Sequence, residues 1–282
     1  MEDKSIVLNN NVKTRYLESK QGSLISDKHI LFIHGLGSSA DRWLDIPDAL
    51  SMYYHTIAVD LMGFGGTDKP TDVNYTIEKF SEFILQFIDK IGLSGNDRKI
   101  TLVGHSLGGY IAVEFAINNM ALIEKLVLLD SSGFLKGPTP LLEQYLNAAK
   151  YPSYDKVRSV FEQLVAQPWR VLPALINTFI ARINSPGAKY SFQSAYQNST
   201  TTQIDLSRLK AIEDIPTLMI WGDKDNLIPI EHSEPFKQVF KNPRVEMIED
   251  AGHAPFTEKP AVNVNYCILF YHKMIDRKDY KH

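Results

Sequence analysis

The sequence is poor in cysteine, and its single thiol excludes disulfide-based folds. Cys267 has no second cysteine with which to form a disulfide within the chain. It lies in the segment NVNYCILFYHKM, which has the apolar pattern of a helix. We therefore expect a buried, unreactive thiol at this position rather than a catalytic nucleophile.

Long apolar runs are also missing from the sequence. No run approaches the ~18 apolar residues that indicate a membrane-spanning helix. The N-terminal segment MEDKSIVLNNN has no apolar stretch of the kind found in secretory signals. These two absences predict a soluble, cytoplasmic protein that does not bind a membrane.

Excess charge of one sign is absent as well. The 30 Lys and Arg residues oppose 33 Asp and Glu residues, for a net charge of −3, and no block of basic residues stands out. This balance gives no electrostatic reason to expect a nucleic-acid partner. The segment GFGGT (63–67) lacks the G-x-x-x-x-G-K-[ST] pattern of a phosphate-binding loop.

Short apolar segments alternate with helical patterns along much of the chain. Segments of the first kind, expected as strands, are 29–35, 55–60, 99–105, 124–130, 216–222 and 244–250. Helical patterns cover 76–92, 107–119 and 260–274. The alternation predicts an α/β fold with a mostly parallel, doubly wound sheet. SIVLNN and VKTRYLES alternate apolar and polar residues and are expected to form an antiparallel edge hairpin.

The alternation stops between Ser131 and Ile212, where several amphipathic helical segments replace the strands. We expect a helical cap at 134–210, inserted between two parts of the core, 1–133 and 211–282. This segment is rich in aromatics: Tyr145, Tyr151, Tyr154, Phe161, Trp169, Phe179, Tyr190, Phe192 and Tyr196. We expect at least half of them to form the cap's own core, and others to line an apolar substrate cavity.

A lone serine stands between two glycines at the junction of a predicted strand and helix. Gly104-His105-Ser106-Leu107-Gly108 fits G-x-S-x-G, a sharp turn that exposes a serine hydroxyl at the sheet edge. The helix that follows would offer free backbone N–H groups to developing negative charge. The alternative is a serine that only caps this helix.

A serine nucleophile needs a base, and the base needs an orienting carboxylate. Among the eight histidines, His253 lies in EDAGHAPFTEKP, a loop that follows a predicted strand. WGDKDNLIP ends another strand and offers Asp223 and Asp225. The chain order Ser, Asp, His is the order that this architecture requires.

Five motifs give the chain a resemblance to the α/β-hydrolase fold family, in its capped, cofactor-independent branch. They are HGLG (34–37), DLMGFGGTDKP (60–70), GHSLGG (104–109), GDKDNLIP (222–229) and AGHAPFTEKP (251–260). The resemblance implies a catalytic triad of Ser106, Asp225 and His253, with Asp225 preferred to Asp223. Asp130 is the candidate if the acid follows the preceding strand, as in some relatives.

The resemblance also implies an oxyanion hole formed by the backbone N–H groups of Leu36 and Leu107, with His34 in a structural role. It implies a serine esterase that acts on small carboxylic esters of short-to-medium acyl or aryl type, without metal or cofactor. One alternative is a carbon–carbon bond hydrolase of aromatic ring-cleavage products, which usually carries Trp after the histidine, where this chain has Ala254. Such enzymes also bind substrate through a cap arginine, for which Arg158, Arg170 and Arg182 are available. A non-catalytic receptor is the other alternative, and the oligomeric state stays open.

Overall fold

The computed structural model contains one eight-stranded sheet and describes residues 1–19, 28–43, 45–51, 53–95 and 98–272. The strand order is β1-β2-β4-β3-β5-β6-β7-β8. The strands are β1 (Glu2–Val7), β2 (Lys13–Glu18), β3 (His29–Ile33), β4 (His55–Val59), β5 (Ile100–His105), β6 (Ile123–Leu129), β7 (Thr217–Gly222) and β8 (Arg244–Ile248). Neighbours from β4 to β8 are parallel, whereas β1–β2 and β2–β4 are antiparallel. The predicted parallel sheet and N-terminal edge hairpin are therefore confirmed.

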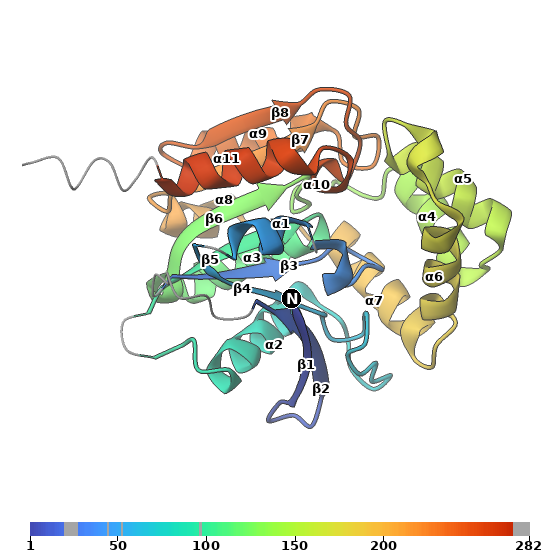
Figure 1. Cartoon of the computed structure of the whole chain (residues 1–282), viewed down its shortest axis with the longest axis horizontal. Helices are drawn as coiled ribbons and strands as arrows, with labels where there is room; N and C mark the ends of the chain where they lie inside the picture. The colour runs from blue at the N-terminus through green and yellow to red at the C-terminus, as the bar shows by residue number, and fades with distance from the viewer. Residues whose placement is uncertain (20–27, 44, 52, 96–97, 273–282) are drawn as a thin grey trace, which may run out of the picture.

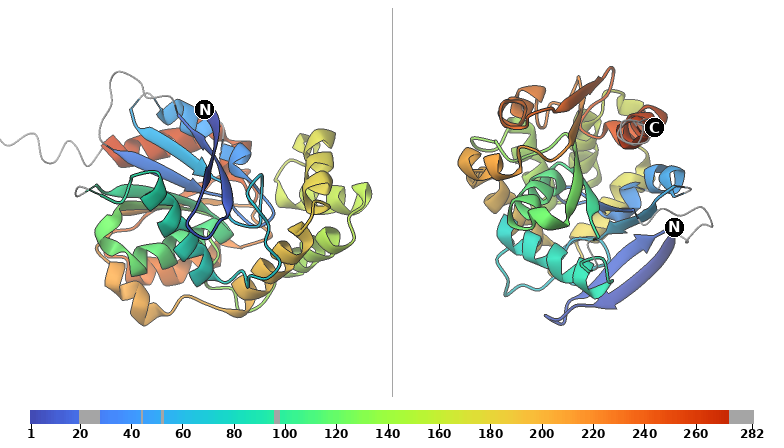
Figure 2. Two further views of the ribbon diagram at one scale, coloured as in Figure 1. Left: turned by 90° about the horizontal axis from the view of Figure 1, so that it is seen from below. Right: turned by 90° about the vertical axis from the view of Figure 1, so that its left-hand side faces the viewer.

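Helices cover both faces of this sheet (Figures 1 and 2). They are η1 (Ala40–Trp43), α1 (Asp45–Leu50), α2 (Ile77–Lys90), α3 (Leu107–Asn118), η2 (Met120–Leu122), α8 (Leu206–Leu209), η4 (Lys210–Ile212), η5 (Ile230–Ser233), α9 (Glu234–Val239), α10 (Pro255–Glu258) and α11 (Pro260–His272). One apolar core packs α2, α3 and α9 against the sheet, and a second packs α1, α10 and α11 against the other face. Alternate residues of each central strand enter alternate cores, which explains their continuously apolar sequences.

Four helices, which we call the cap helices, form a group beyond the ends of the parallel strands (Figure 1). They are α4 (Pro140–Lys150), α5 (Tyr154–Leu164), α6 (Pro173–Ile183) and α7 (Ala188–Thr201), with the short turn η3 (Pro168–Arg170) between α5 and α6. The arrows of β3 and β6 point toward this group (Figure 1). The limits 134–210 for a separate cap domain stay a prediction.

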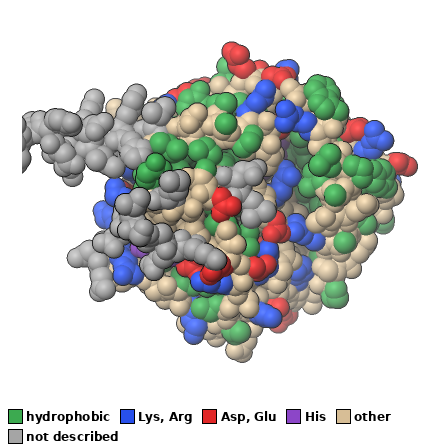
Figure 3. Space-filling model, viewed as in Figure 1, with side chains coloured by type: hydrophobic (Ala, Val, Ile, Leu, Met, Phe, Trp, Pro, Cys, Tyr) green, Lys and Arg blue, Asp and Glu red, His purple; other side chains and the backbone are tan. Residues whose placement is uncertain are grey.

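The aromatic side chains of the cap divide into a buried and an exposed set. Those buried are Tyr145, Phe161, Phe179, Phe192 and Tyr196, whereas Tyr151, Tyr154, Trp169 and Tyr190 are exposed. More than half therefore form the core of this region, as expected. Charged side chains of both signs lie between the cap helices and the rest of the molecule (Figure 3).

Four of the six predicted strands end one or two residues early, whereas β5 and β7 end at His105 and Gly222 as predicted. The expected strand 29–35 ends at Ile33 because His34 and Gly35 form side-chain and loop hydrogen bonds instead of sheet pairs. The predicted helix 260–274 corresponds to α11, and its last two residues lie outside the described residues. Cys267 is buried on α11, and burial raises the pKa of its thiol to about 12, as expected of an unreactive thiol. No helix among the described residues is both long and apolar enough to cross a bilayer.

Candidate active site

Ser106 occupies a strained turn between β5 and α3. Its φ of 54° and ψ of −120° are uncommon for a residue with a side chain, and such strain clusters at functional sites. The turn requires glycine at two nearby positions. A Cβ on Gly108 would overlap the carbonyl oxygen of Ile33, and a Cβ on Gly104 would overlap that of Gly108. The predicted turn is therefore present.

The Ser106 hydroxyl does not cap α3, although Ser106 is the residue at its N-terminus. The backbone carbonyl of Ser106, in contrast, accepts hydrogen bonds from the amide and hydroxyl of Ser132, at 3.1 and 3.2 Å. These bonds hold the backbone of the turn, and the Ser106 hydroxyl makes no hydrogen bond to the described residues. The interpretation of Ser106 as a simple helix cap is wrong.

Asp225 and His253 are joined by a buried hydrogen bond. His253 Nδ1 lies 2.8 Å from Asp225 Oδ2. The second oxygen, Oδ1, accepts the amides of Leu227 and Ile228 at 2.8 and 3.0 Å. A carboxylate with three donors is fixed in place and presents one edge to the imidazole. Because Nδ1 is engaged, Nε2 is the nitrogen available for another proton transfer.

The other two candidate acids, Asp223 and Asp130, accept backbone amides, and among the described residues neither is hydrogen-bonded to His253. Asp223 is exposed, and its Oδ1 accepts the amide of Ala251 at 3.2 Å. Asp130 is fully buried at the end of β6, with Oδ1 accepting the amide of Gly222 at 2.9 Å. Its Oδ2 has no partner among the described residues. Burial, together with the nearby charge of Asp225, raises the pKa of Asp130 well above its ordinary range.

Asp130, Asp225 and His253 are also the described residues that come nearest to a metal site. One donor atom from each lies within 4.8 Å of the others. However, Asp225 and His253 bond to each other, and Asp225 Oδ1 is occupied by two amides. Because the facing atoms of Asp225 and His253 are taken by this bond, the donors fit a hydrogen-bonded acid–base pair better than a metal centre.

The loop that carries His253 is held from two sides. The amide of His253 donates to the carbonyl of Leu164 at the end of α5, at 2.7 Å. The Glu258 carboxyl accepts the amides of Gly252 and Ala166, both at 2.8 Å. The histidine loop is therefore joined to the chain between α5 and η3.

His105 is a member of this site that the sequence analysis did not identify. Its Nε2 donates to the carbonyl of His253 at 2.7 Å, and the two ring centroids are 4.7 Å apart. Burial lowers the pKa of His105 well below its ordinary value, so the ring is neutral. Its place directly before Ser106 was the signal available in the sequence. Among the described residues, no hydrogen bond joins the Ser106 hydroxyl to His253, a contact that is often long without substrate.

Leu36 lies in the loop after β3, and side chains fix the peptide groups on both sides of it. His34 Nδ1 donates to the carbonyl of Gly35 at 2.8 Å, while His34 Nε2 accepts the amide of Leu61 at 3.0 Å. The first bond orients the peptide that carries the Leu36 N–H. Burial lowers the pKa of His34, in agreement with a neutral ring that accepts at Nε2. His34 thus holds the loop, as expected.

The cap helices contact this loop directly. The Tyr145 hydroxyl, on α4, donates to the carbonyl of Leu36 at 3.1 Å. A Cβ on Gly37 would lie 2.6 Å from that hydroxyl and 2.7 Å from the Phe192 ring. Neither Leu36 nor Leu107 uses its N–H in a hydrogen bond within the described chain. In the part of the chain that the structure describes, both amides are therefore available to a ligand.

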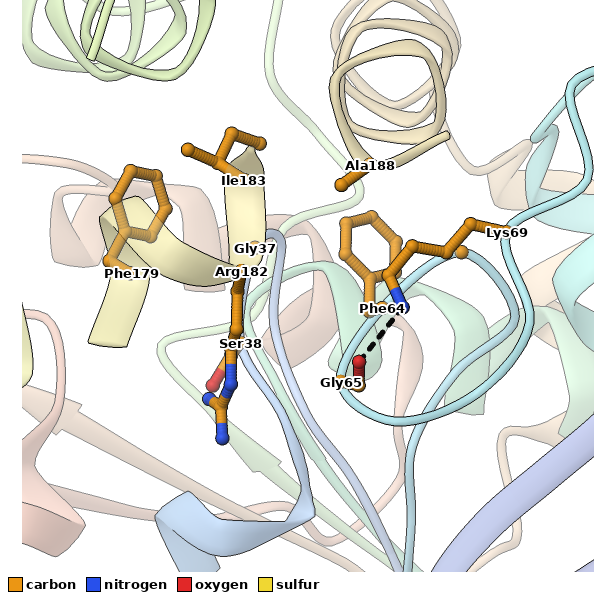
Figure 4. Close-up of a pocket in the computed structure, with 10 residues that line it drawn as sticks. Gly37, Ser38, Phe64, Gly65, Lys69, Phe179, Arg182, Ile183 and Ala188 are labelled. Carbon is orange, nitrogen blue, oxygen red and sulfur yellow. Dashed lines mark hydrogen bonds between the residues drawn. The ribbon is translucent and has the colours of Figure 1, made fainter. Parts of the chain in front are cut away.

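A small cavity of about 20 Å³ lies beside this loop, and Figure 4 shows the side chains around it. Gly37 and Ser38 border it from the loop, Phe179 and Arg182 from α6, and Lys69 from the turn after β4. Ser106 and His253 do not border it, and they are only 7% and 5% exposed. The candidate site is therefore covered in this structure.

The comparisons with known proteins agree with this geometry. The sequence model of the family described as alpha/beta hydrolase fold matches residues 28–260. Lipase 1 of Psychrobacter immobilis is 30% identical over 270 residues, covering 92% of this chain and 80% of the lipase. The 2-hydroxy-6-oxo-6-(2'-aminophenyl)hexa-2,4-dienoic acid hydrolase of Metapseudomonas resinovorans is 25% identical over 275 residues, or 94% and 89% of the two chains.

Solved structures share the fold. A meta-cleavage product hydrolase from Pseudomonas fluorescens IP01 superposes with a TM-score of 0.85 at 23% identity, over 96% of this chain and 98% of the other. At that identity the likeness concerns the fold alone.

Proposed function

Because this chain belongs to the alpha/beta hydrolase fold family, we propose that it is a serine hydrolase that cleaves small carboxylic esters. The observation that carries the proposal is the buried hydrogen bond between His253 and Asp225 beside the strained turn at Ser106. A serine placed in this way, with an oriented imidazole nearby, is the arrangement that acyl transfer needs.

The proposed reaction starts with proton transfer from the Ser106 hydroxyl to His253 Nε2. The serine oxygen attacks the ester carbonyl, and the N–H groups of Leu36 and Leu107 stabilise the oxyanion. The imidazolium returns its proton to the leaving alcohol, which gives an acyl-enzyme. Water, deprotonated by His253, then releases the acid and restores Ser106. Asp225 keeps the imidazole oriented and stabilises its charged form.

The preference for short-to-medium acyl or aryl esters is supported by the packing above Leu36. The rings of Tyr145 and Phe192 lie 5.1 Å apart, and those of Tyr145 and Phe179 lie 5.5 Å apart. These side chains pack closely next to the Leu36 loop, where we expect the acyl group to lie. A compact apolar or aromatic group fits such surroundings better.

The test is hydrolysis of 4-nitrophenyl esters from acetate to dodecanoate by the wild type and three variants. We expect Ser106→Ala to abolish turnover and Asp225→Asn to lower kcat by about 10⁴-fold, because the imidazole loses its orientation. Asp223→Asn, in the same loop, is the matched control and should stay within a few-fold of the wild type. Near wild-type activity of Asp225→Asn would refute the assignment of the acid.

A second candidate is hydrolysis of a carbon–carbon bond in aromatic ring-cleavage products, which the likeness to the dienoic acid hydrolase favours. The same assay separates the candidates. If no ester is hydrolysed in a Ser106-dependent manner, the carbon–carbon hydrolase becomes the better interpretation. If ligands then stabilise the protein without any turnover, a receptor is the better interpretation.

A further inference from the structure

His105 lies between the nucleophile and the loop that carries His253. It is the last residue of β5 and directly precedes Ser106, so the sheet and the strained turn fix its backbone. The residue is buried, with 8% of its surface exposed. Burying a polar ring costs free energy unless its nitrogens find partners. The partners of this ring should therefore show why a histidine stands here.

The ring nitrogen Nε2 of His105 contacts the backbone of the histidine loop. It donates a buried hydrogen bond to the carbonyl oxygen of His253 at 2.7 Å, and the two residues are 148 positions apart in the sequence. Their rings are neighbours as well, with centroids 4.7 Å apart and planes inclined by 49°. Because a carbonyl oxygen can only accept, this bond requires the proton of the neutral ring to be on Nε2.

Aromatic neighbours hold the ring of His105 in this direction. The ring centroid of Phe256 lies 4.8 Å away in an edge-to-face contact, and that of Trp43 lies 6.4 Å away. These two neighbours stack on each other at 4.4 Å. Gly35 also borders the ring closely, since a Cβ there would lie 3.0 Å from Nδ1. The packing thus keeps Nε2 directed at the carbonyl of His253.

Both polar groups of the His253 backbone are held, and they are held by different parts of the molecule. The amide donates to the carbonyl of Leu164 at the end of α5, whereas the carbonyl accepts from His105 of the core. The imidazole is fixed separately, because its Nδ1 lies 2.8 Å from Asp225 Oδ2. Of these three attachments, only the one from His105 comes from the strand that leads into Ser106.

We propose that His105 is a positioning residue, whose Nε2–H fixes the backbone of His253 relative to Ser106 so that the imidazole faces the serine hydroxyl. One peptide bond and one hydrogen bond then join the base to the nucleophile, a shorter path than the one through Asp225 and β7. Such support matters because a displacement of about 1 Å in a catalytic group costs about 100-fold in rate. This inference rests on the proposed ester hydrolysis and adds to it a residue that acts through His253.

Substitutions at His105 separate the hydrogen bond from the packing of the ring. His105→Phe keeps an aromatic ring but has no donor. His105→Gln offers an amide N–H at nearly the reach of Nε2, whereas the side chain in His105→Asn is shorter by a methylene group. The matched control is His55→Phe, which removes a mostly buried strand histidine whose Nε2 lies 2.7 Å from Glu18 Oε1. His55 begins β4, whereas His105 ends β5.

The assay is hydrolysis of 4-nitrophenyl acetate, with kcat and KM determined separately. We expect His105→Phe and His105→Asn to lower kcat by about 10- to 100-fold and to change KM by less than about 3-fold, because the base is displaced while the ester still binds. His105→Gln should recover most of kcat, since it restores the donor. His55→Phe should keep the kcat of the wild type.

The decisive quantity is the ratio of kcat in His105→Gln to kcat in His105→Phe. A ratio of about 5 or more, with KM nearly constant, supports the proposal. A ratio near 1 overturns it, whether both variants are active or both are impaired, because the donor would then have no effect. A change confined to KM overturns it as well. If urea unfolding shows that His105→Phe does not fold, His105→Asn takes its place in the ratio.

Failure of the ester assay itself would be a separate result. If the wild type hydrolyses no 4-nitrophenyl ester, ester hydrolysis is refuted, and the position of His253 is followed by the ¹H NMR signal of its Nδ1 proton, which lies in the bond to Asp225. Asp225→Asn assigns this signal. Its loss in His105→Phe with retention in His105→Gln and His55→Phe supports the positioning role. Equal signals in the two His105 variants overturn it.

Discussion

At the scale of single residues, two neighbouring carboxyl groups have opposite surroundings. Asp225 receives hydrogen bonds from two amides and contacts an imidazole nitrogen. Asp130 receives one amide and keeps a buried oxygen without a partner in the described chain. Burial and the charge of Asp225 raise the pKa of Asp130. The surroundings of Asp130 therefore favour its neutral, protonated form.

This difference predicts a pH-dependent effect of Asp130→Asn on stability. The folded-state pKa of Asp130 lies above its unfolded value of about 3.9. As pH rises from about 4 toward the folded-state pKa, the unfolded chain loses this proton while the folded protein keeps it. The free energy of unfolding therefore decreases over this range. Asparagine does not titrate and tolerates a φ of 43°. We expect the variant to gain stability relative to the wild type between pH 4 and pH 7, measured by urea unfolding.

Asp223→Asn controls for the change of carboxyl to amide in the neighbouring loop. A stability difference between Asp130→Asn and the wild type that is the same at both pH values would contradict a neutral Asp130.

The sequence predicted Ser106, Asp225 and His253 because turn residues and chain order mark the ends of parallel strands. The structure adds the Asp225–His253 bond, and the catalytic roles stay predictions. His105 was not identified because its importance depends on the direction of its side chain toward a distant loop, where Nε2 donates to the carbonyl of His253. No periodicity or motif spacing in one sequence carries that information.

At the scale of elements, a cap helix and the core together fix the loop after β3, which carries the candidate oxyanion amide of Leu36. Tyr145 of α4 fixes the Leu36 carbonyl, and His34 fixes the Gly35 carbonyl. Consecutive peptide groups are thus held by a cap residue and a core residue. The position of α4 and the direction of the Leu36 amide are consequently linked.

Tyr145→Phe tests this link, since it removes the hydroxyl and keeps the ring. We expect a loss of about 1 kcal/mol in the free energy of unfolding and a decrease in kcat of about 3- to 10-fold on a neutral ester. Tyr190→Phe, on the exposed side of α7, is the control. Equal effects of the two variants on kcat would show that the hydroxyl does not order the loop.

Sequence periodicity identified the long elements and missed the short ones. α2 and α3 span 14 and 12 residues, long enough for an apolar pattern to repeat. η1 and α10 have 4 residues each, and such short turns are defined by their tertiary contacts rather than by local propensity. Both of these turns flank the candidate site, so its immediate surroundings were the least predictable part.

At the scale of the whole molecule, an ion-pair network joins the N-terminal hairpin to the cap. Arg15 of β2 contacts Asp60 at 3.0 Å and Asp41 at 2.7 Å, and Asp41 also contacts Arg182 of α6 at 2.5 Å. The Asp41–Arg182 pair is about one-third exposed on each side, so it contributes little to global stability. Its effect should be local and sensitive to salt.

Arg182→Gln should therefore loosen the cap without unfolding the core. We expect amide hydrogen exchange in α6 to increase by about 2- to 5-fold at low salt, while exchange in α2 stays constant. Arg158→Gln provides the control, because its partner Glu162 belongs to the same helix. An increase shared equally by α2 would indicate global destabilisation instead.

The hydrogen bond from the His253 amide to Leu164 has a consequence for grafting experiments. A chimera that exchanges the whole insert for that of another hydrolase would also discard the carbonyl of Leu164 and the amide of Ala166, which Glu258 binds. The recipient would keep its histidine but lose two of the attachments of the histidine's loop. A chimera that keeps residues 164–166 of this chain should therefore hold the histidine loop better than one that replaces them. The same constraint applies to natural exchange of the insert between hydrolases.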